Sequence, residues 1–257
     1  MKVIIIILLV ILVIALVYVA SPREYFGLKP TLKYKDFGNY DSNKTYRVAI
    51  IAGTHGNEPA GTAALEILVG SGYFDEFAKK HPNISVRVIP RVNEWGLKLH
   101  TRHQPHLFHP DVNRNYVIGE NGEDGTESTS KQVAMLTKDA DLIIDLHEGW
   151  GYHQITPESI GSTLSYTGKI AEALAHHSVG SINGTLHSLY KFVVLDPKTH
   201  PSCDISTTLR CIRHRVGKDY ILIETTGQND IQPLNVRLQQ HQHLIQKILG
   251  IIDRYVK

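Results

Sequence analysis

The stretch Val48–Glu58, with the sequence VAIIAGTHGNE, decides how this chain folds. Its first part is an unbroken apolar run, which is typical of a strand that is buried on both faces of a parallel sheet. His55 and Glu58 follow in a turn that contains two glycines. A His-x-x-Glu pair taken alone is often a chance match. The pair is more significant here, because polar residues also follow two other apolar runs.

Those runs end at His147 and at Glu224. Ligands bind beyond the carboxyl ends of the strands in a sheet of this kind, so these residues are expected at one edge together with His55. Two imidazoles and one carboxylate are a typical ligand set for a catalytic zinc ion, which keeps its fourth position for water or substrate. The sequence therefore predicts one zinc ion held by His55, Glu58 and His147.

Short apolar segments alternate with segments of helical periodicity. Strands are expected over residues 46–52, 84–90, 141–146, 190–195 and 220–225, with an edge strand near 31–34. Helices are expected over residues 59–69, 128–139, 167–178 and 233–255. This alternation predicts an α/β fold whose mixed, mostly parallel sheet carries helices on both faces. The 257 residues, 42% of them hydrophobic, suffice for one sizeable core.

The N-terminal segment differs from the rest. Val3–Ala20 is an unbroken apolar run, long enough to cross a hydrocarbon core as a helix. A cleaved signal peptide is the alternative, although the residues around the end of the run fit the small-residue rule for cleavage poorly. We expect residues 1–22 to be a transmembrane anchor or signal segment, residues 23–44 a tether, and residues 45–257 the catalytic domain.

The expected location is therefore a membrane, reached through a single N-terminal helix. Basic residues follow the apolar run more often than they precede it, which favours a cytoplasmic domain, but a translocated domain stays open. Cys203 and Cys211 would close a small loop in an oxidising compartment and stay free thiols in a reducing one. The net charge of +2, with no basic stripe, indicates no nucleic-acid partner.

Four motifs in a fixed order resemble the zinc carboxypeptidase superfamily. They are Gly53–Glu58 (GTHGNE), Asp111–Asn115 (DVNRN), Asp145–His147 (DLH) and Glu224. That superfamily includes carboxypeptidase A-like peptidases and the succinylglutamate desuccinylase/aspartoacylase group. The resemblance covers most of the chain after the tether. One departure is the turn Asn93–Gly96, where Glu replaces the Pro of the superfamily's Asn-Pro-x-Gly pattern.

The resemblance implies a role for each residue at the metal. His55, Glu58 and His147 would be the zinc ligands. Asp111 would accept a hydrogen bond from His55 and fix its tautomer, unless it merely caps a turn. Glu224 would be the general base, unless it only marks the point where its strand leaves the core.

The resemblance also implies how a substrate is held. Arg114 with Asn113 would bind its free carboxylate, because a guanidinium group matches a carboxylate with two hydrogen bonds. Arg102 would stabilise the developing oxyanion, with Arg91 as a competitor for that role. Two remaining features have open roles. His100, His103, His106 and His109 would form a second metal site or a polar loop, and Glu148 and Tyr152 would line the pocket or simply form the loop.

The implied function is a zinc-dependent hydrolase that cleaves an amide bond next to a free carboxylate. Water on the zinc ion, assisted by Glu224, would attack the amide carbonyl. The substrate would be a small N-acyl amino acid, as in the succinylglutamate desuccinylase/aspartoacylase group, or the C-terminal residue of a peptide, as in the carboxypeptidases. The GNE sequence that ends at Glu58 favours the deacylase slightly. An ester substrate and an inactive binding protein on the same fold are the rival interpretations.

Overall fold

A computed structural model describes residues 2–20, 31–104, 111–120, 122–195, 203, 206–228 and 231–256 of the chain. The described strands are β1 (Lys35–Phe37), β2 (Tyr46–Ala52), β3 (Ile84–Ile89), β4 (Tyr116–Gly119), β5 (Gly122–Gly125), β6 (Leu142–Gly149), β7 (Thr163–Thr167), β8 (Val193–Leu195) and β9 (Asp219–Thr226). The helices are α1 (Lys2–Ala20), α2 (Pro59–Gly70), α3 (Tyr73–Lys80), α4 (Glu94–Leu99), α5 (Ser128–Thr137), α6 (Lys169–Asn183), α7 (Leu209–Arg215) and α8 (Leu234–Ile251), with 3₁₀ turns at Val112–Arg114, Ser188–Tyr190 and Ile252–Arg254.

Seven of the described strands form one mixed sheet in the order β1-β3-β2-β6-β9-β7-β8. The central strands β3, β2, β6 and β9 are parallel to one another, β1 runs antiparallel to β3, and β7 runs antiparallel to β9. All eight residues of β6 are buried, as are the last five of β2. Burial on both faces explains why these strands are largely apolar, and the predicted mixed, mostly parallel sheet is confirmed.

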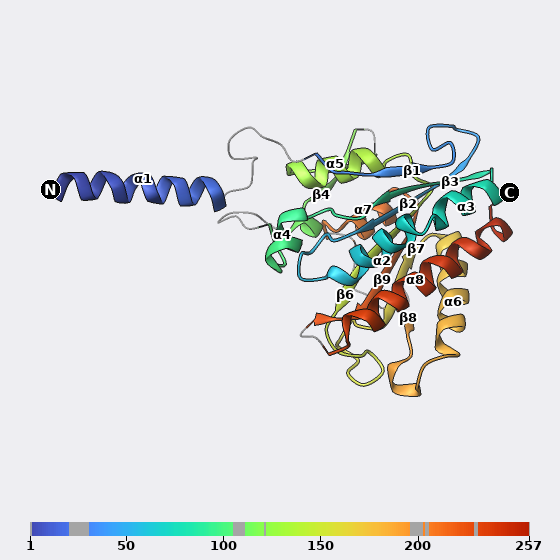
Figure 1. Ribbon diagram of the computed structural model, residues 1–257. Coiled ribbons are helices and arrows are strands. Elements are labelled where there is room, and N and C mark those ends of the chain that lie inside the picture. The colour runs from blue at the N-terminus through green and yellow to red at the C-terminus, as the bar shows by residue number, and fades with distance from the viewer. Residues whose placement is uncertain are drawn as a thin grey trace.

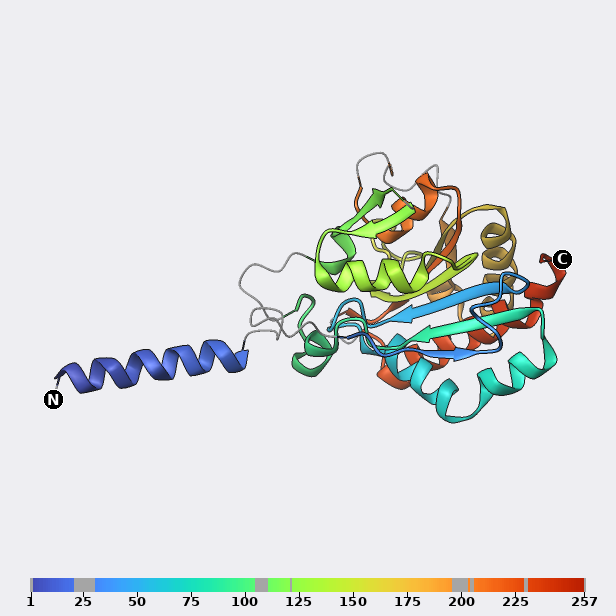
Figure 2. The same ribbon diagram turned by 90° about the horizontal axis from the view of Figure 1, so that it is seen from above.

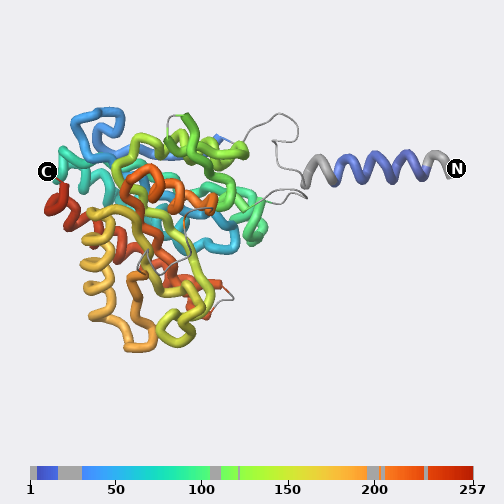
Figure 3. Tube along the Cα trace, turned by 180° about the vertical axis from the view of Figure 1, so that it is seen from behind, coloured from blue at the N-terminus to red at the C-terminus, as the bar shows by residue number. Residues whose placement is uncertain are grey.

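Helices cover both faces of this sheet (Figure 1). Because alternate side chains of a strand point to opposite faces, β2 contributes to two separate cores. Val48 and Ile50 pack with side chains of α2, α3, α6 and α8, whereas Ala49 and Ile51 pack with side chains of α5 and α7. Figure 2 shows α5 on one side of the sheet and α2, α3 and α8 on the other. Seen from behind, α6 and α8 lie side by side (Figure 3).

The structure differs from the expected elements in several places. β6 extends to Gly149, so His147 lies inside the strand rather than after it. The expected edge strand near residues 31–34 lies instead at β1, where Phe37 is buried and Asp36 forms two hydrogen bonds with Arg87 of β3. The short elements α3, α4, α7, β7 and the β4–β5 pair were not predicted, because most are too brief to establish a clear periodicity.

The apolar N-terminal run forms α1, and the side chains of residues 5–16 are exposed. Among the residues that the structure describes, no helix combines the length and the apolar character that a membrane crossing needs. The anchor or signal segment expected over residues 1–22 stays a prediction.

Cys203 and Cys211 form a disulfide bond across a sequence separation of eight residues. We expect the variant in which both are replaced by Ser to have a free energy of unfolding about 2 kcal/mol lower, because the bond restricts a short loop in the unfolded chain. Urea denaturation measures this difference. A reducing agent should lower the midpoint of the natural protein to that of the variant and leave the variant unchanged. An unchanged midpoint for the natural protein would contradict the prediction.

Candidate metal centre and catalytic pocket

The turn between β2 and α2 carries the first two candidate ligands. β2 ends at Ala52, and Glu58 directly precedes α2, whose first residue is Pro59. A Cβ atom on Gly56 would lie 1.8 Å from the carbonyl carbon of Gly96, so the backbones of two separate turns are in contact there. Only glycine permits this approach. The glycine between the candidate ligands therefore fixes the position of the turn.

The neighbouring turn, Asn93–Gly96, keeps its shape without the expected proline. The Asn93 side chain accepts a hydrogen bond from the Gly96 N–H at 2.8 Å, and the Asn93 N–H donates to the Gly53 carbonyl at 2.7 Å. Glu94 begins α4, so it takes up the first position of a helix. Glu in place of Pro thus leaves the close approach of Gly96 to Gly56, in the turn that carries His55 and Glu58, intact.

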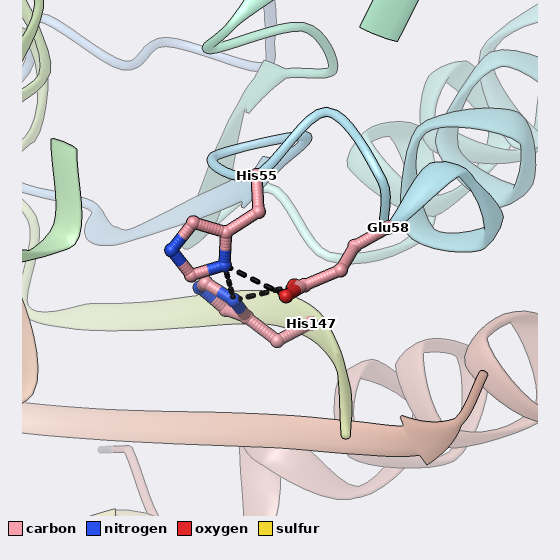
Figure 4. A group of neighbouring side chains, drawn as sticks. All are labelled: His55, Glu58 and His147. Carbon is pink, nitrogen blue, oxygen red and sulfur yellow. Dashed lines mark hydrogen bonds and ion pairs between the residues drawn. The ribbon is translucent and has the colours of Figure 1, made fainter. Parts of the chain in front are cut away.

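His55, Glu58 and His147 point toward one another (Figure 4). The Nδ1 atoms of the two histidines are 3.2 Å apart, and each lies 2.8 Å from an oxygen of Glu58. A tetrahedral zinc ion with bonds of about 2.0–2.1 Å sets its ligand atoms about 3.3 Å apart. The three side chains are buried, and together they are the one group among the described residues that is suited to hold a metal. They fit one zinc ion.

A carboxylate lies behind each histidine. The Nε2 atom of His55 is 2.9 Å from Asp111 Oδ1, and the Nε2 atom of His147 is 3.2 Å from Asp145 Oδ1. Such partners orient the imidazole and raise its basicity toward a metal. Asp111 also caps a turn, since the same oxygen accepts the Asn113 N–H at 2.9 Å, so both interpretations of Asp111 agree with the structure. The sequence had not pointed to Asp145 for this position.

Carboxylates surround the two imidazoles of the centre. Burial alone would raise the pKa of Glu58, but the positive charges of His55 and His147 outweigh it and hold the pKa well below its usual range. Burial would lower the pKa of His147, but Asp145 and Glu58 raise it well above its usual value. The centre therefore attracts positive charge, and a divalent cation can replace the protons that the imidazoles would otherwise hold.

Glu224 lies beside the candidate ligands, because β9 pairs with β6 and sets Glu224 opposite His147. Its side chain is buried, and its Oε2 atom has no hydrogen-bond partner among the described residues. Burial raises the pKa of Glu224, the charge of His147 opposes this, and the charges of Glu58 and Asp145 add to it. A metal cation close by would favour the ionised form, which is the form a general base needs.

Arg102 lies at the edge of the centre. Its guanidinium group is 3.2 Å from Glu58 Oε1 and 2.9 Å from Asp111 Oδ2. Arg91, the competing residue, instead forms an ion pair with Glu66 and does not line this pocket. Of the two, Arg102 is therefore the one that can reach a developing oxyanion.

Asn113 and Arg114 line the same pocket as the candidate ligands and Glu224. Arg114 is exposed, and its guanidinium group donates to the Asn113 carbonyl at 2.9 Å. Asn113 is buried, and its side-chain oxygen accepts the Leu209 N–H at 3.3 Å, which leaves its amide NH₂ group without a hydrogen-bond partner among the described residues. Both side chains can therefore donate to a carboxylate that enters the pocket.

The pocket has a volume of about 270 Å³ and includes residues that the sequence did not single out. Gln228 donates to the Glu148 carbonyl at 2.9 Å and lies 3.4 Å from Glu58 Oε1. Arg210, Ser165 and Tyr220 line another part of the pocket. Ser165 and Arg210 lie on the short elements β7 and α7, which the sequence does not predict, whereas Tyr220 lies on β9, which it does.

The residues with open roles lie elsewhere. Glu148 is buried behind the ligands, where its side chain accepts the Ala60 N–H and pairs with Arg237. Tyr152 contacts the ring of Tyr190 and is not part of the pocket lining. His103 is 3.8 Å from Asp111, and His100 is exposed. His106 and His109 lie outside the described residues, so a second metal site there stays untested.

Replacing Asp145 by Asn should weaken zinc binding about 10-fold to 100-fold, because the partner of His147 loses its charge. The Tyr220 hydroxyl donates to Asp145 at 2.5 Å and can donate to the amide oxygen of Asn as well, so the fold should survive. Competition with a fluorescent chelator measures the affinity. Asp36→Asn, which removes a charge from the distant pair with Arg87, is the matched control. Equal affinities in both variants would exclude a supporting role for Asp145.

Comparison with known families gives a match over most of the chain. Residues 44–251 match the model of the succinylglutamate desuccinylase/aspartoacylase catalytic domain. A comparison with curated protein sequences gave no match.

Several solved structures share the fold. The tripeptide-bound cell shape determinant Csd4 of Helicobacter pylori superposes with a TM-score of 0.67 at 19% identity, over 86% of this chain and 55% of Csd4. An mDAP-bound form of Csd4, described as a D,L-carboxypeptidase, gives 0.66 at 20% identity, over 86% of this chain and 54% of that one. A candidate metallopeptidase from Shewanella amazonensis gives 0.64 at 18% identity, over 86% and 82%. The chain thus spans little more than half of Csd4, and at these identities the likeness establishes the fold.

Proposed function

The chain belongs to the succinylglutamate desuccinylase/aspartoacylase family, and we propose that it is a zinc-dependent hydrolase of an amide bond next to a free carboxylate. One observation carries the proposal. Two imidazole nitrogens and a carboxylate converge at the strand ends, in the same pocket as a buried Glu224 with an oxygen that lacks a partner among the described residues. Of the two substrate classes considered, we propose a small N-acyl amino acid.

A zinc ion held by His55, Glu58 and His147 would polarise the amide carbonyl and lower the pKa of water. Residues of the chain bind the substrate, transfer the proton and stabilise the developing charge. Arg114 and Asn113 donate to the free carboxylate and orient the amide. Glu224 removes a proton as water forms the new C–O bond, and Arg102 donates to the carbonyl oxygen as it gains charge. Glu224 then returns the proton to the nitrogen as the C–N bond breaks, which yields an acid and an amine.

Removal of C-terminal residues from peptides is the second candidate. It is favoured by the structural likeness to Csd4, one form of which is described as a D,L-carboxypeptidase. An inactive binding protein is the least favoured alternative, because every residue that the reaction needs is present in one pocket. The cellular location, and with it a membrane tether, stays a prediction.

The deciding experiment assays zinc-loaded protein on matched N-acyl amino acids and short peptides. We expect about one zinc ion per chain and a chelator-sensitive release of amino acid. Preference for the acyl amino acids would support the deacylase, and preference for peptides would support the carboxypeptidase. Bound zinc without turnover on either class would contradict amide hydrolysis and favour the binding protein or an ester substrate.

A further inference from the structure

Glu148 is a buried charge that does not line the catalytic pocket. It directly follows the candidate ligand His147 on β6. Because successive side chains of a strand point to opposite faces, Glu148 points away from the face of His147 and toward α2 and α8. Burial of a carboxylate is costly unless its oxygens are paired. The partners of Glu148 therefore indicate what this charge does.

Each oxygen of the Glu148 carboxylate has a partner on a different helix. Oε1 accepts the N–H of Ala60, in the first turn of α2, at 2.6 Å, and Oε2 accepts from the guanidinium group of Arg237 on α8. The backbone between β9 and α8 closes over this ion pair, since a Cβ atom on Gly227 would overlap Glu148 Oε2. Glu148 thus joins β6 to two helices at one point.

The contact with Ala60 supplies a cap that α2 would otherwise take from a metal ligand. Glu58 directly precedes α2, in the position from which a side-chain oxygen usually accepts an N–H of the first turn. Pro59 has no N–H, so Ala60 carries the first free donor of the helix. Glu58 makes no such side-chain hydrogen bond, and its two oxygens instead lie 2.8 Å from the two candidate histidine ligands. Glu148 accepts the N–H in its place.

Backbone groups connect the same two carboxylate residues. The Glu148 N–H donates to Glu58 Oε2 at 3.1 Å. Gln228, shortly after β9, donates to the Glu148 carbonyl at 2.9 Å and lies 3.4 Å from Glu58 Oε1. These contacts hold β6 and the turn before α2 in a fixed relation, which a metal site with ligands from both segments requires.

We propose that Glu148 is a positioning residue for Glu58: it caps α2 from β6, held there by Arg237, and so leaves the Glu58 carboxylate to the metal. Without an acceptor at Glu148, the N–H of Ala60 would compete for that carboxylate, and Glu58 would turn from the histidines toward its own helix. The inference deepens the proposed function and rests on it for the reaction. The affinity for zinc is measured without a substrate, so the two can fail separately.

Glu148→Gln tests the need for two oxygens. An amide replaces one oxygen by an NH₂ group, which would face a donor, either Ala60 or Arg237. We expect zinc to bind about 10-fold to 100-fold more weakly, as measured by competition with a fluorescent chelator. Glu123→Gln is the matched control, because Glu123 is also buried and its oxygens are paired with basic side chains at the opposite end of β9 from Glu224. Equal zinc affinities in the two variants would overturn the inference.

Two charge-balanced double variants separate the cap from the ion pair. The first is Glu148→Gln with Arg237→Met, and the second is Glu148→Leu with Arg237→Met. Both remove the whole ion pair, which a fold tolerates better than the loss of one partner. Only the first keeps an acceptor for the Ala60 N–H, so it should bind zinc nearly as tightly as the natural protein, whereas the second should bind about 10-fold to 100-fold more weakly. Equal weakening in both would mean that Glu148 acts through stability alone and would overturn the inference.

Bound cobalt(II) gives a readout of the ligand geometry, because its visible absorption depends on how its ligands are arranged. The spectrum of the second double variant should differ from that of the natural protein, and the spectrum of the first should not. If the difference in zinc affinity holds but no amide substrate is turned over, the inference stands and the hydrolase is overturned. Turnover by the natural protein, with equal zinc affinities in the two double variants, would uphold the hydrolase and overturn the inference.

Discussion

Replacing Glu224 by Gln is expected to lower kcat about 1,000-fold while the protein keeps one zinc ion per chain. General base catalysis contributes about 100-fold to 10,000-fold, and the amide of Gln accepts no proton at neutral pH. Glu58, the other carboxylate that lines the pocket, has both oxygens within hydrogen-bond distance of the histidines, whereas Glu224 Oε2 has no partner among the described residues. Metal analysis and single-turnover rates measure the two quantities on one sample.

Because glutamine has nearly the size and shape of glutamate, a loss of activity in this variant can be distinguished from a loss of structure. In Glu224→Gln the amide would fill the same buried space without a charge, so the melting temperature should not fall. Glu172→Gln, at an exposed position on α6, controls for the loss of a carboxylate elsewhere. A near-normal rate for the Glu224 variant would refute its role as base. A loss of zinc together with activity would mean instead that Glu224 supports the metal site.

The metal centre could be predicted from the sequence because each of its parts leaves a signal within a short stretch of residues. His55 and Glu58 belong to one turn, and the parallel central strands are apolar runs that stand out along the chain. Once those strands are placed in one sheet, their ends must meet at one edge. The register confirms this, since His147 lies opposite Glu224 and Ala52 lies opposite Leu146.

Asp145 could also have been found. It is a carboxylate inside an otherwise apolar run, two residues before His147, and residues two apart share a face of a strand. A buried charge in that position needs a partner, and His147 is the nearest one that can serve. The signal for this pair is therefore present in the sequence, as a charge in a buried strand beside a candidate ligand.

The part of the pocket that Arg210 and Ser165 line could not have been predicted in the same way. It depends on β7, a five-residue strand that runs antiparallel to β9, and on α7, a helix of seven residues. Elements this short leave little periodicity in the sequence. The position of Arg210 follows from how α7 packs on β7 and β9, and this is decided by tertiary contacts rather than by its neighbours in sequence.

Replacing His147 by Ala is expected to abolish zinc binding at micromolar metal and, with it, all turnover. His147 supplies one of three candidate ligand atoms, and partners that only support a ligand already contribute about 10-fold to 100-fold in affinity. The loss should therefore exceed that of Asp145→Asn by a wide margin. Equilibrium dialysis against buffered zinc measures the affinity without reference to any substrate.

Folding must be separated from metal binding in this variant, because His147 is buried between Glu58 and Asp145. Its removal leaves Asp145 without its imidazole partner and takes one of the partners of Glu58, so Ala should also lower stability in the absence of metal. His147→Gln keeps a polar side chain there and is the milder second variant. Zinc at about 100 times its dissociation constant stabilises a folded protein by about 2.7 kcal/mol. The natural protein should therefore melt at a higher temperature with zinc, whereas neither variant should respond, and a zinc-dependent rise in His147→Gln would show that the ion is held by other residues.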